Sequence, residues 1–234
     1  MTPDTALNSI KAQATQDKAT EMAAYHKVNR VYLGTSNPDI DAPAKGWREV
    51  LSLEDRLNLC QELWNSNIHE GRSAAAKLLT QARIRPNDSG AWALILTWVP
   101  KFDSWAIADH VCIAAQKCIT ADPTRIDQLE SWTLHKNMWV RRAALIATLP
   151  FAKLRNPKPN DVLMTDRVLD WAALYVTDKD WFIQKAVAVW LLNLSKRCPA
   201  RTGTFLREHG HYMRQFAKIE AVQHLPTEFV MPPD

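Results

Sequence analysis

Hydrophobic residues recur at helical spacing through most of the chain, most clearly over residues 131–149. Asn137 can accept a hydrogen bond from the free N–H groups of a helix that begins at Met138. At 100° per residue, the apolar residues that follow fill one broad arc, while Met138, Leu145 and Leu149 line the opposite side. The pattern predicts a helix that packs between two layers.

The same pattern returns further along the chain. Asp180 takes the place of Asn137, and residues 181–187 stand where residues 138–144 stood. Ser104 and Trp105 begin a fainter copy, and residues 67–79 a weaker one. A helical unit that recurs about every 35 to 45 residues is typical of HEAT-like and armadillo-like solenoids. The fold class is therefore predicted to be all-α, as a HEAT-like or armadillo-like α-solenoid.

The breaks between helical segments predict one domain over residues 1–225 and a loose tail over residues 226–234. We expect about ten to twelve helices, the first one or two of them within residues 3–28. Asp122 and Pro123 form one of the short turn-forming breaks. Because residues 40–46 contain Pro43 and Gly46, they are predicted to form a loop.

Composition agrees with an all-α protein and narrows the choice of partner. The chain of 234 residues has 6 glycines, 10 tryptophans and a net charge of +4, which permits an anionic partner. No CxxC pair or zinc-ligand spacing occurs, and His209 and His211 have no third ligand nearby. We expect no metal and no cofactor. Since no apolar leader or membrane-length apolar stretch is found, we expect a cytoplasmic protein without a membrane partner.

Asp109 is the most informative acidic residue of the sequence. When the repeats are aligned on their tryptophans, Asp109 falls where the other copies have Ala143 and Ala186, on the predicted buried arc. A carboxylate there needs a hydrogen-bonding partner or an opening to solvent. Trp105 precedes it by one helical turn, so the indole and the carboxylate share a helix face. This pair can hold a cation, or Asp109 can form a structural ion pair beside a packed Trp105.

Arg141, Arg142 and Lys185 are the basic candidates. Arg142 and Lys185 occupy equivalent positions of successive repeats, so stacking would place them in a row that can bind phosphates. The alternative is that all three lie on solvated helix edges.

Several segments together resemble the DNA alkylation repair proteins, the HEAT-like-repeat DNA glycosylases of the AlkD type. The resemblance runs from about residue 22 to residue 225, in the right order and at the right spacings. The segments that carry it are Ala24-Tyr25-His26-Lys27, Tyr32-Leu33-Gly34, Ser104-Trp105 with Asp109, residues 137–144, and Phe182-Ile183-Gln184-Lys185-Ala186.

The resemblance implies a single C-shaped solenoid that grips duplex DNA on its concave face. It also implies hydrolysis of the N-glycosidic bond of cationic alkylated purines such as N3-methyladenine and N7-methylguanine. By position, Asp109 matches the catalytic carboxylate and Trp105 the first aromatic wall. Arg142 matches an arginine near the phosphate of the lesion, and Tyr25 and Lys27 match residues close to the DNA backbone.

One departure from the family pattern keeps alternatives open. The resemblance places a second aromatic wall at position 189, which here is Val189, while Trp190 follows one residue later. One residue rotates a helical side chain by about 100°, so Trp190 is only a possible second wall. We therefore retain two alternatives to a monomeric glycosylase. The first is a repeat protein that binds distorted or branched DNA without excision, and the second is a protein-binding scaffold.

Overall fold

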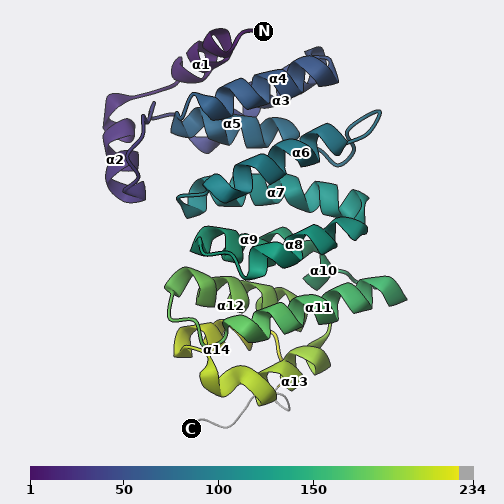
Figure 1. The fold of residues 1–234 in the computed structure, drawn as a ribbon. Helices are drawn as coiled ribbons and strands as arrows, with labels where there is room; N and C mark the ends of the chain where they lie inside the picture. The colour runs from purple at the N-terminus through teal and green to yellow at the C-terminus, as the bar shows by residue number, and fades with distance from the viewer. Residues whose placement is uncertain (227–234) are drawn as a thin grey trace. The chain divides into compact units, whose positions relative to one another are not determined.

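The computed structural model describes residues 1–226, and their regular structure is helical apart from an isolated bridge between Val31 and Ile68 (Figure 1). Fourteen α-helices and three short 3-10 helices occur in this part of the chain. The α-helices are α1 (Pro3–Lys11), α2 (Gln16–His26), α3 (Asn37–Val50), α4 (Leu53–Asn65), α5 (His69–Leu79), α6 (Ser89–Trp98), α7 (Trp105–Ala121), α8 (Ile126–Thr133), α9 (Met138–Ala147), α10 (Leu149–Ala152), α11 (Pro159–Tyr175), α12 (Trp181–Ser195), α13 (Pro199–His209) and α14 (Gln215–Ala221).

The chain divides into two compact units, residues 1–122 and 123–234, and each is described by itself. The division falls at Asp122–Pro123, which the sequence marks as a turn-forming break. A single C-shaped domain over residues 1–225 stays a prediction. The predicted tail begins at Pro226, and residues 227–234 lie outside the described residues.

The first unit is organised around α5. This helix contacts α3, α4 and α7 (Figure 1). The consecutive alanines Ala74, Ala75 and Ala76 are all completely buried. Small side chains let neighbouring helices approach on several sides at once, so α5 is covered along most of its length.

The second unit is organised around α12 in the same way. The helix contacts α9, α11, α13 and α14. Its side chains Ile183, Trp190 and Leu191 are completely buried. A helix that is apolar on nearly every side is expected to lie in the interior of its unit.

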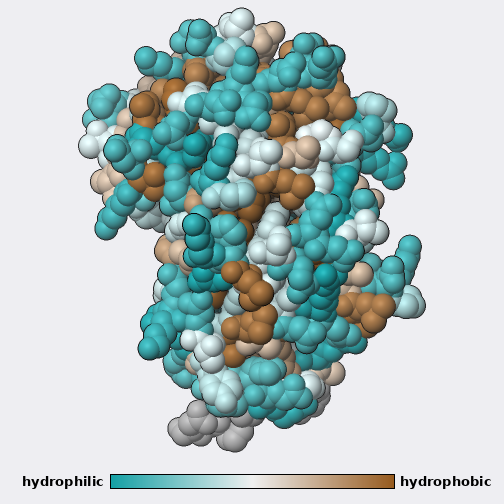
Figure 2. All heavy atoms as spheres, viewed as in Figure 1, coloured by the Kyte–Doolittle hydropathy of each residue, from teal (hydrophilic) through white to brown (hydrophobic). Residues whose placement is uncertain are grey.

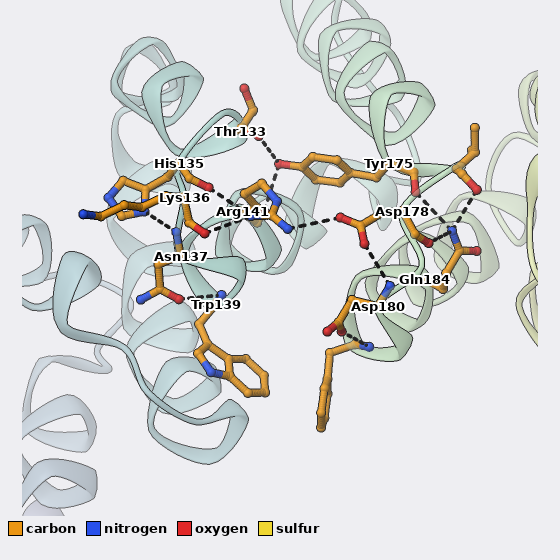
Figure 3. Close-up of polar contacts among 12 residues, drawn as sticks. Thr133, His135, Lys136, Asn137, Trp139, Arg141, Tyr175, Asp178, Asp180 and Gln184 are labelled. Carbon is orange, nitrogen blue, oxygen red and sulfur yellow. Dashed lines mark hydrogen bonds and ion pairs between the residues drawn. The ribbon is translucent and has the colours of Figure 1, made fainter. Parts of the chain in front are cut away.

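Helix starts follow the predicted caps. The Asn137 side chain accepts a hydrogen bond of 3.0 Å from the N–H of Trp139, and the Asp180 side chain accepts one of 2.7 Å from the N–H of Phe182 (Figure 3). These bonds satisfy donors that the first turn of a helix leaves without partners. The predicted starts of α9 and α12 are confirmed.

Two predictions about the elements are wrong. The described residues contain more helices than the ten to twelve expected, and the predicted loop at residues 40–46 is the middle of α3. Pro43 removes one intrahelical donor, yet Ile40, Ala44 and Trp47 still form a buried face. Burial at this i, i+4, i+7 spacing stabilises α3 despite its proline. Within residues 1–226, no helix is long and apolar enough to cross a bilayer.

Candidate active site

Trp105 and Asp109 lie one turn apart at the start of α7. Ser104 is the N-cap residue of this helix, with extended backbone, and Trp105 is its first residue. Both Trp105 and Asp109 are half-buried. Residues four apart on a helix are neighbours on its surface, so the indole and the carboxylate face the same space.

That space is a pocket of about 360 Å³ within the first unit. Four segments form its wall: α2, the start of α3, the first residue of α5, and α7. The lining residues are Met22, Tyr25, His26, Thr35, Ser36, Asn37, Ile40, His69, Trp105, Ala106, Asp109, His110 and Ile113. The structure thus places Tyr25, Trp105 and Asp109, three of the residues singled out from the sequence, around one cavity.

Aromatic rings from α2 and α7 meet beside Asp109. The ring centroids of Tyr25 and Trp105 are 6.0 Å apart with the planes at 88°, and those of His26 and Trp105 are 5.6 Å apart. Tyr25 is 69% exposed, so its phenol lies at the open side of the pocket. Edge-to-face pairs of this kind are favoured because the positive edge of one ring meets the negative face of the other.

Asp109 is the only acidic side chain among the described residues that line the pocket, and no lysine or arginine lies among them. The histidines of the wall are held neutral. Burial, with help from Arg30, lowers the pKa of His26. Burial lowers the pKa of His69 to about 3 and that of His110 to about 4. Near neutral pH the wall therefore combines one carboxylate with uncharged aromatic and imidazole rings.

The connection between α2 and α3 is held by a buried carboxylate. Glu70, which is completely buried, accepts hydrogen bonds from the backbone N–H groups of Leu33 at 2.9 Å, Gly34 at 2.8 Å and Thr35 at 3.3 Å. Three backbone donors stabilise the charged form of a buried carboxylate. The segment that carries Thr35 into the pocket wall is fixed by these bonds.

Gly34 allows α2 to approach this connection closely. Its φ is +87°, and a Cβ atom there would lie 2.1 Å from the carbonyl oxygen of Thr15 and 2.6 Å from the backbone nitrogen of Ala19. No other residue type fits without a shift of α2. The close contact sets the position of α2, and with it the positions of Tyr25 and His26.

An ion pair ties the segment that follows α2 to the start of α7. Arg30 donates to the Asp103 carboxylate, and an Arg72 nitrogen lies 3.8 Å from the same carboxylate. The Arg30 side chain is only 1% exposed. Because Asp103 and Ser104 precede Trp105 directly, this contact fixes the end of the helix that presents the indole.

The helix caps revise the alignment of the repeats. Counted from its N-cap, Asp109 is the fifth residue of α7, Arg142 the fifth of α9 and Lys185 the fifth of α12. The alignment of Asp109 with Ala143 and Ala186 is therefore wrong by one residue. The Asp109 carboxylate is half-exposed and does not lie on a buried arc. At the equivalent position, α9 and α12 carry cationic side chains.

Arg141 and its surroundings belong to the second unit. Its guanidinium lies 3.1 Å from the Asp178 carboxylate and donates to the carbonyl oxygens of His135 at 3.0 Å and Lys136 at 3.3 Å (Figure 3). These contacts hold the turn before α9 against the turn before α12. Arg141 is thus engaged within the protein.

Arg142 and Lys185, which are predicted to form a row of cations, do not form an exposed row. Lys185 is half-buried and binds both carboxylate oxygens of Glu220, at 2.8 and 2.6 Å. Arg142 is only 7% exposed, so the alternative of a solvated helix edge is wrong for this residue. Its match to an arginine near the phosphate of the lesion stays a prediction. Lys27, by contrast, is exposed at the end of α2, where its φ of 55° is left-handed.

The possibility of a second aromatic wall at Trp190 finds no support in the structure. Trp190 is completely buried in the second unit, and Val189 beside it is half-buried. The rotation of one residue along α12 directs the indole into the packed interior. The aromatic residue exposed on this helix is Trp181, which is 47% exposed and stacks on Phe216 with centroids 5.7 Å apart.

Hydrophilic side chains cover most of the face seen in Figure 2, with hydrophobic residues in small patches between them. Residues 1–226 contain no group of three or more His, Cys, Asp or Glu side chains that could hold a metal ion.

Sequence reasoning missed three pocket residues, His26, His69 and His110. His26 follows Tyr25 in one of the family-like segments, so its neighbourhood was marked but its role was not. His69 lies at the start of a weak repeat, and His110 follows Asp109. No local pattern distinguishes them, because their meeting depends on how α2, α5 and α7 pack.

Known protein families include one that this chain matches. The sequence profile of a family described as DNA alkylation repair enzyme matches residues 6–225. The chain belongs to this family. Among curated protein sequences, none matches the chain.

Solved structures of other proteins share the fold of this DNA alkylation repair protein. A predicted DNA alkylation repair enzyme from Enterococcus faecalis superposes with a TM-score of 0.76 at 21% identity, over 92% of this chain and 98% of that one. AlkD2 from Streptococcus mutans gives 0.61 at 13% identity, over 91% and 99%. The protein smu.31 from Streptococcus mutans UA159 gives 0.61 at 16% identity, over 81% and 92%. The predicted all-α class is confirmed.

Proposed function

We propose that this DNA alkylation repair protein is a monofunctional glycosylase that acts as a monomer on duplex DNA. It excises positively charged alkylated purines, such as N3-methyladenine and N7-methylguanine. The observation that carries the proposal is the pocket in which Asp109 and Trp105 meet without a lysine or arginine among the described lining residues. A cation is favoured there, in a chain whose overall charge is +4.

The leaving group of the reaction is the cationic purine, which departs readily without help from the enzyme. As the bond between the purine nitrogen and the sugar lengthens, its electron pair moves to the cationic base, which departs neutral. Positive charge then develops on the deoxyribose. Asp109 stabilises that charge through a carboxylate in a partly desolvated site, where electrostatic interactions are strong.

Trp105 and Asp109 have different roles in the remaining steps of the reaction. The indole face of Trp105 attracts the cation, a contribution of about 0.5 to 2 kcal/mol. Asp109 orients the water whose oxygen bonds to the anomeric carbon, and the proton of that water passes to solvent. No lysine lines the pocket within the described residues to attack the sugar, so the products are free base and an abasic site without strand cleavage.

The DNA contacts of the proposal come from Tyr25 and Lys27 in the first unit and from Arg141, Arg142 and Lys185 in the second. Tyr25 and Lys27 are exposed. Arg141 and Lys185 have carboxylate partners, so a phosphate must compete with Asp178 and Glu220 for them.

The test is incubation with a duplex that contains one N7-methylguanine, followed by measurement of released base. We expect Asp109→Asn to reduce the excision rate by about 100-fold or more, because one electrostatic group at the reacting centre contributes that much. Duplex binding should stay close to that of the wild type. Asp170→Asn, which makes the same charge change on exposed α11, serves as the matched control. Equal rates for wild type and Asp109→Asn would contradict the catalytic role.

A second function is favoured by one observation. Since Trp190 is completely buried, α12 supplies no aromatic wall at this position, and the protein would then bind distorted or branched DNA without excision. In the same experiment, this alternative predicts that the protein binds the duplex and shifts its mobility, but releases no base. A protein-binding scaffold predicts neither.

A further inference from the structure

His26 contacts the indole of the pocket and two further rings. Its imidazole is 5.6 Å from the Trp105 ring, centroid to centroid, with the planes tilted at 49°. On another side it stacks on His69 at 4.6 Å, and it is nearly parallel to Tyr32 at 5.9 Å. The Trp105 indole is thus backed by a layer of rings that comes from three separate segments.

The rings behind His26 are themselves fixed. The Tyr32 hydroxyl donates to the carbonyl oxygen of Val28 at 3.1 Å. The backbone N–H of His69 donates to the carbonyl oxygen of Val31 at 3.0 Å, and His69 is only 5% exposed. His26 therefore has little room to withdraw from Trp105, and a smaller side chain would leave the indole unsupported on that side.

Burial and the charged groups around His26 together favour its neutral imidazole. Arg30 lies in the segment after α2, paired with Asp103, and Glu70 lies on α5. The other titratable groups that face this region are Tyr25, Tyr32, His69, Asp109 and His110. Burial and Arg30 lower the pKa of His26, and Glu70 opposes them with a smaller effect.

We propose that His26 is a positioning residue that acts in two ways: its ring holds the Trp105 indole in place, and its neutral form keeps the pocket open to a cation. A protonated His26 would place a positive charge beside the indole. That charge would oppose both the cationic purine and the positive charge that develops on the sugar. Excision then depends on the unprotonated fraction of His26.

This inference rests on the proposed glycosylase activity, and its test compares variants at each pH. We measure single-turnover release of N7-methylguanine from duplex DNA for wild type, His26→Phe and His26→Ala between pH 5 and 8. The ratio of variant to wild type removes every pH dependence that the three proteins share, including that of the substrate.

His26→Phe keeps a ring but cannot be protonated. We expect its rate at pH 8 to exceed that of His26→Ala, because a ring still supports the indole, and its ratio to the wild type to rise about tenfold for each pH unit below the pKa of His26. The ratio for His26→Ala should rise in the same way as the pH falls. At pH 8, however, its rate should be lower than that of His26→Phe by about tenfold or more, since a misplaced indole slows the reaction. His224→Phe, an exposed histidine in the second unit, should give a flat ratio near one.

Two outcomes of the rate measurements would overturn the inference. A His26→Phe ratio that stays flat below the pKa of His26 would exclude the role of charge, and equal rates for the phenylalanine and alanine variants at pH 8 would exclude positioning. An NMR titration of the wild-type histidines gives a readout that does not depend on activity. A His26 pKa at or above 6.5 would also contradict the inference. Failure of the wild type to release base at any pH would instead reject the proposed glycosylase.

Discussion

At the residue scale, the candidate site depends on one carboxylate that sits among uncharged rings. Asp109 is half-buried, so its charge is screened less than that of a surface carboxylate. Near it, His69 and His110 stay neutral because burial makes their protonation costly. A cation that enters the pocket meets the field of Asp109 with little opposition from these walls.

The buried His69 predicts a pH dependence of stability. Its pKa is about 3 in the folded protein, against about 6.5 for an exposed histidine. Between these values the unfolded chain binds one more proton, so stability is complete above pH 6.5 and falls as the pH drops. The expected slope is about 1.4 kcal/mol per pH unit for this one histidine.

Urea unfolding of wild type and His69→Phe at several pH values between 4.5 and 7.5 checks this expectation. The phenylalanine variant keeps a ring against His26 and Tyr32 but has no proton to bind. Its free energy of unfolding should decline less steeply with falling pH, because unfolding of this variant takes up about one proton fewer. Parallel curves for the two proteins would show that His69 is not the group that titrates.

At the scale of elements, equal helix positions acquire different surroundings from their neighbours. Asp109, Arg142 and Lys185 are each the fifth residue after an N-cap. Packing of α7 against α5 and α6 leaves Asp109 beside a pocket, whereas packing of α12 against α14 brings Glu220 to Lys185. The role of each position is set by the helix that packs beside it, not by its place in the repeat.

The contact between α2 and the segment before α3 predicts a strong effect of Gly34→Ala. A Cβ atom would meet backbone atoms of Thr15 and Ala19 at less than 3 Å, and the positive φ adds strain. We expect a loss of about 2 kcal/mol or more in the free energy of unfolding. Because α2 must move, excision should fall as well.

Gly46→Ala is the matched control for this substitution. Gly46 lies inside α3 with no atom within 4 Å of the added Cβ. Alanine is the better helix former, so this variant should gain about 0.5 to 1 kcal/mol. Thermal unfolding measures both changes, and a Gly34→Ala variant as stable as the wild type would contradict the account of how α2 is held.

At the scale of the whole molecule, the net charge of +4 favours an anionic partner, but some cations are already engaged. Arg141 and Lys185 each bind a carboxylate of the same unit. Release of counterions on binding a phosphate makes DNA affinity fall with salt, by about one unit of logarithmic slope for each phosphate neutralised. Intramolecular carboxylates compete for these cations.

This competition predicts opposite effects of two substitutions at one ion pair. Glu220→Gln should free Lys185, tighten binding to undamaged duplex and steepen the salt slope, while Lys185→Ala should weaken binding and lower the slope by about one unit. Fluorescence anisotropy over a salt series measures both. If neither slope changes, Lys185 does not contact a phosphate.

Much of the helical architecture follows from the sequence because its causes are local. Asn137 and Asp180 cap helices through hydrogen bonds to residues two positions away. The approach of Trp105 to Asp109 depends only on the pitch of one helix. The loop predicted around Pro43 is wrong because the helix that contains this proline is stabilised by burial, and local sequence patterns do not show which residues are buried.

The sequence by itself determined an all-α chain, the starts of its main helices and one pairing of an indole with a carboxylate. Tertiary structure alone decided which side chains surround that pair. His26, His69 and His110 meet only because α2, α5 and α7 pack together, and packing also buries Arg142 and Trp190. Hydrogen bonds within a helix are fixed by neighbours in the chain. The charge state and exposure of a side chain depend instead on residues that are distant in sequence.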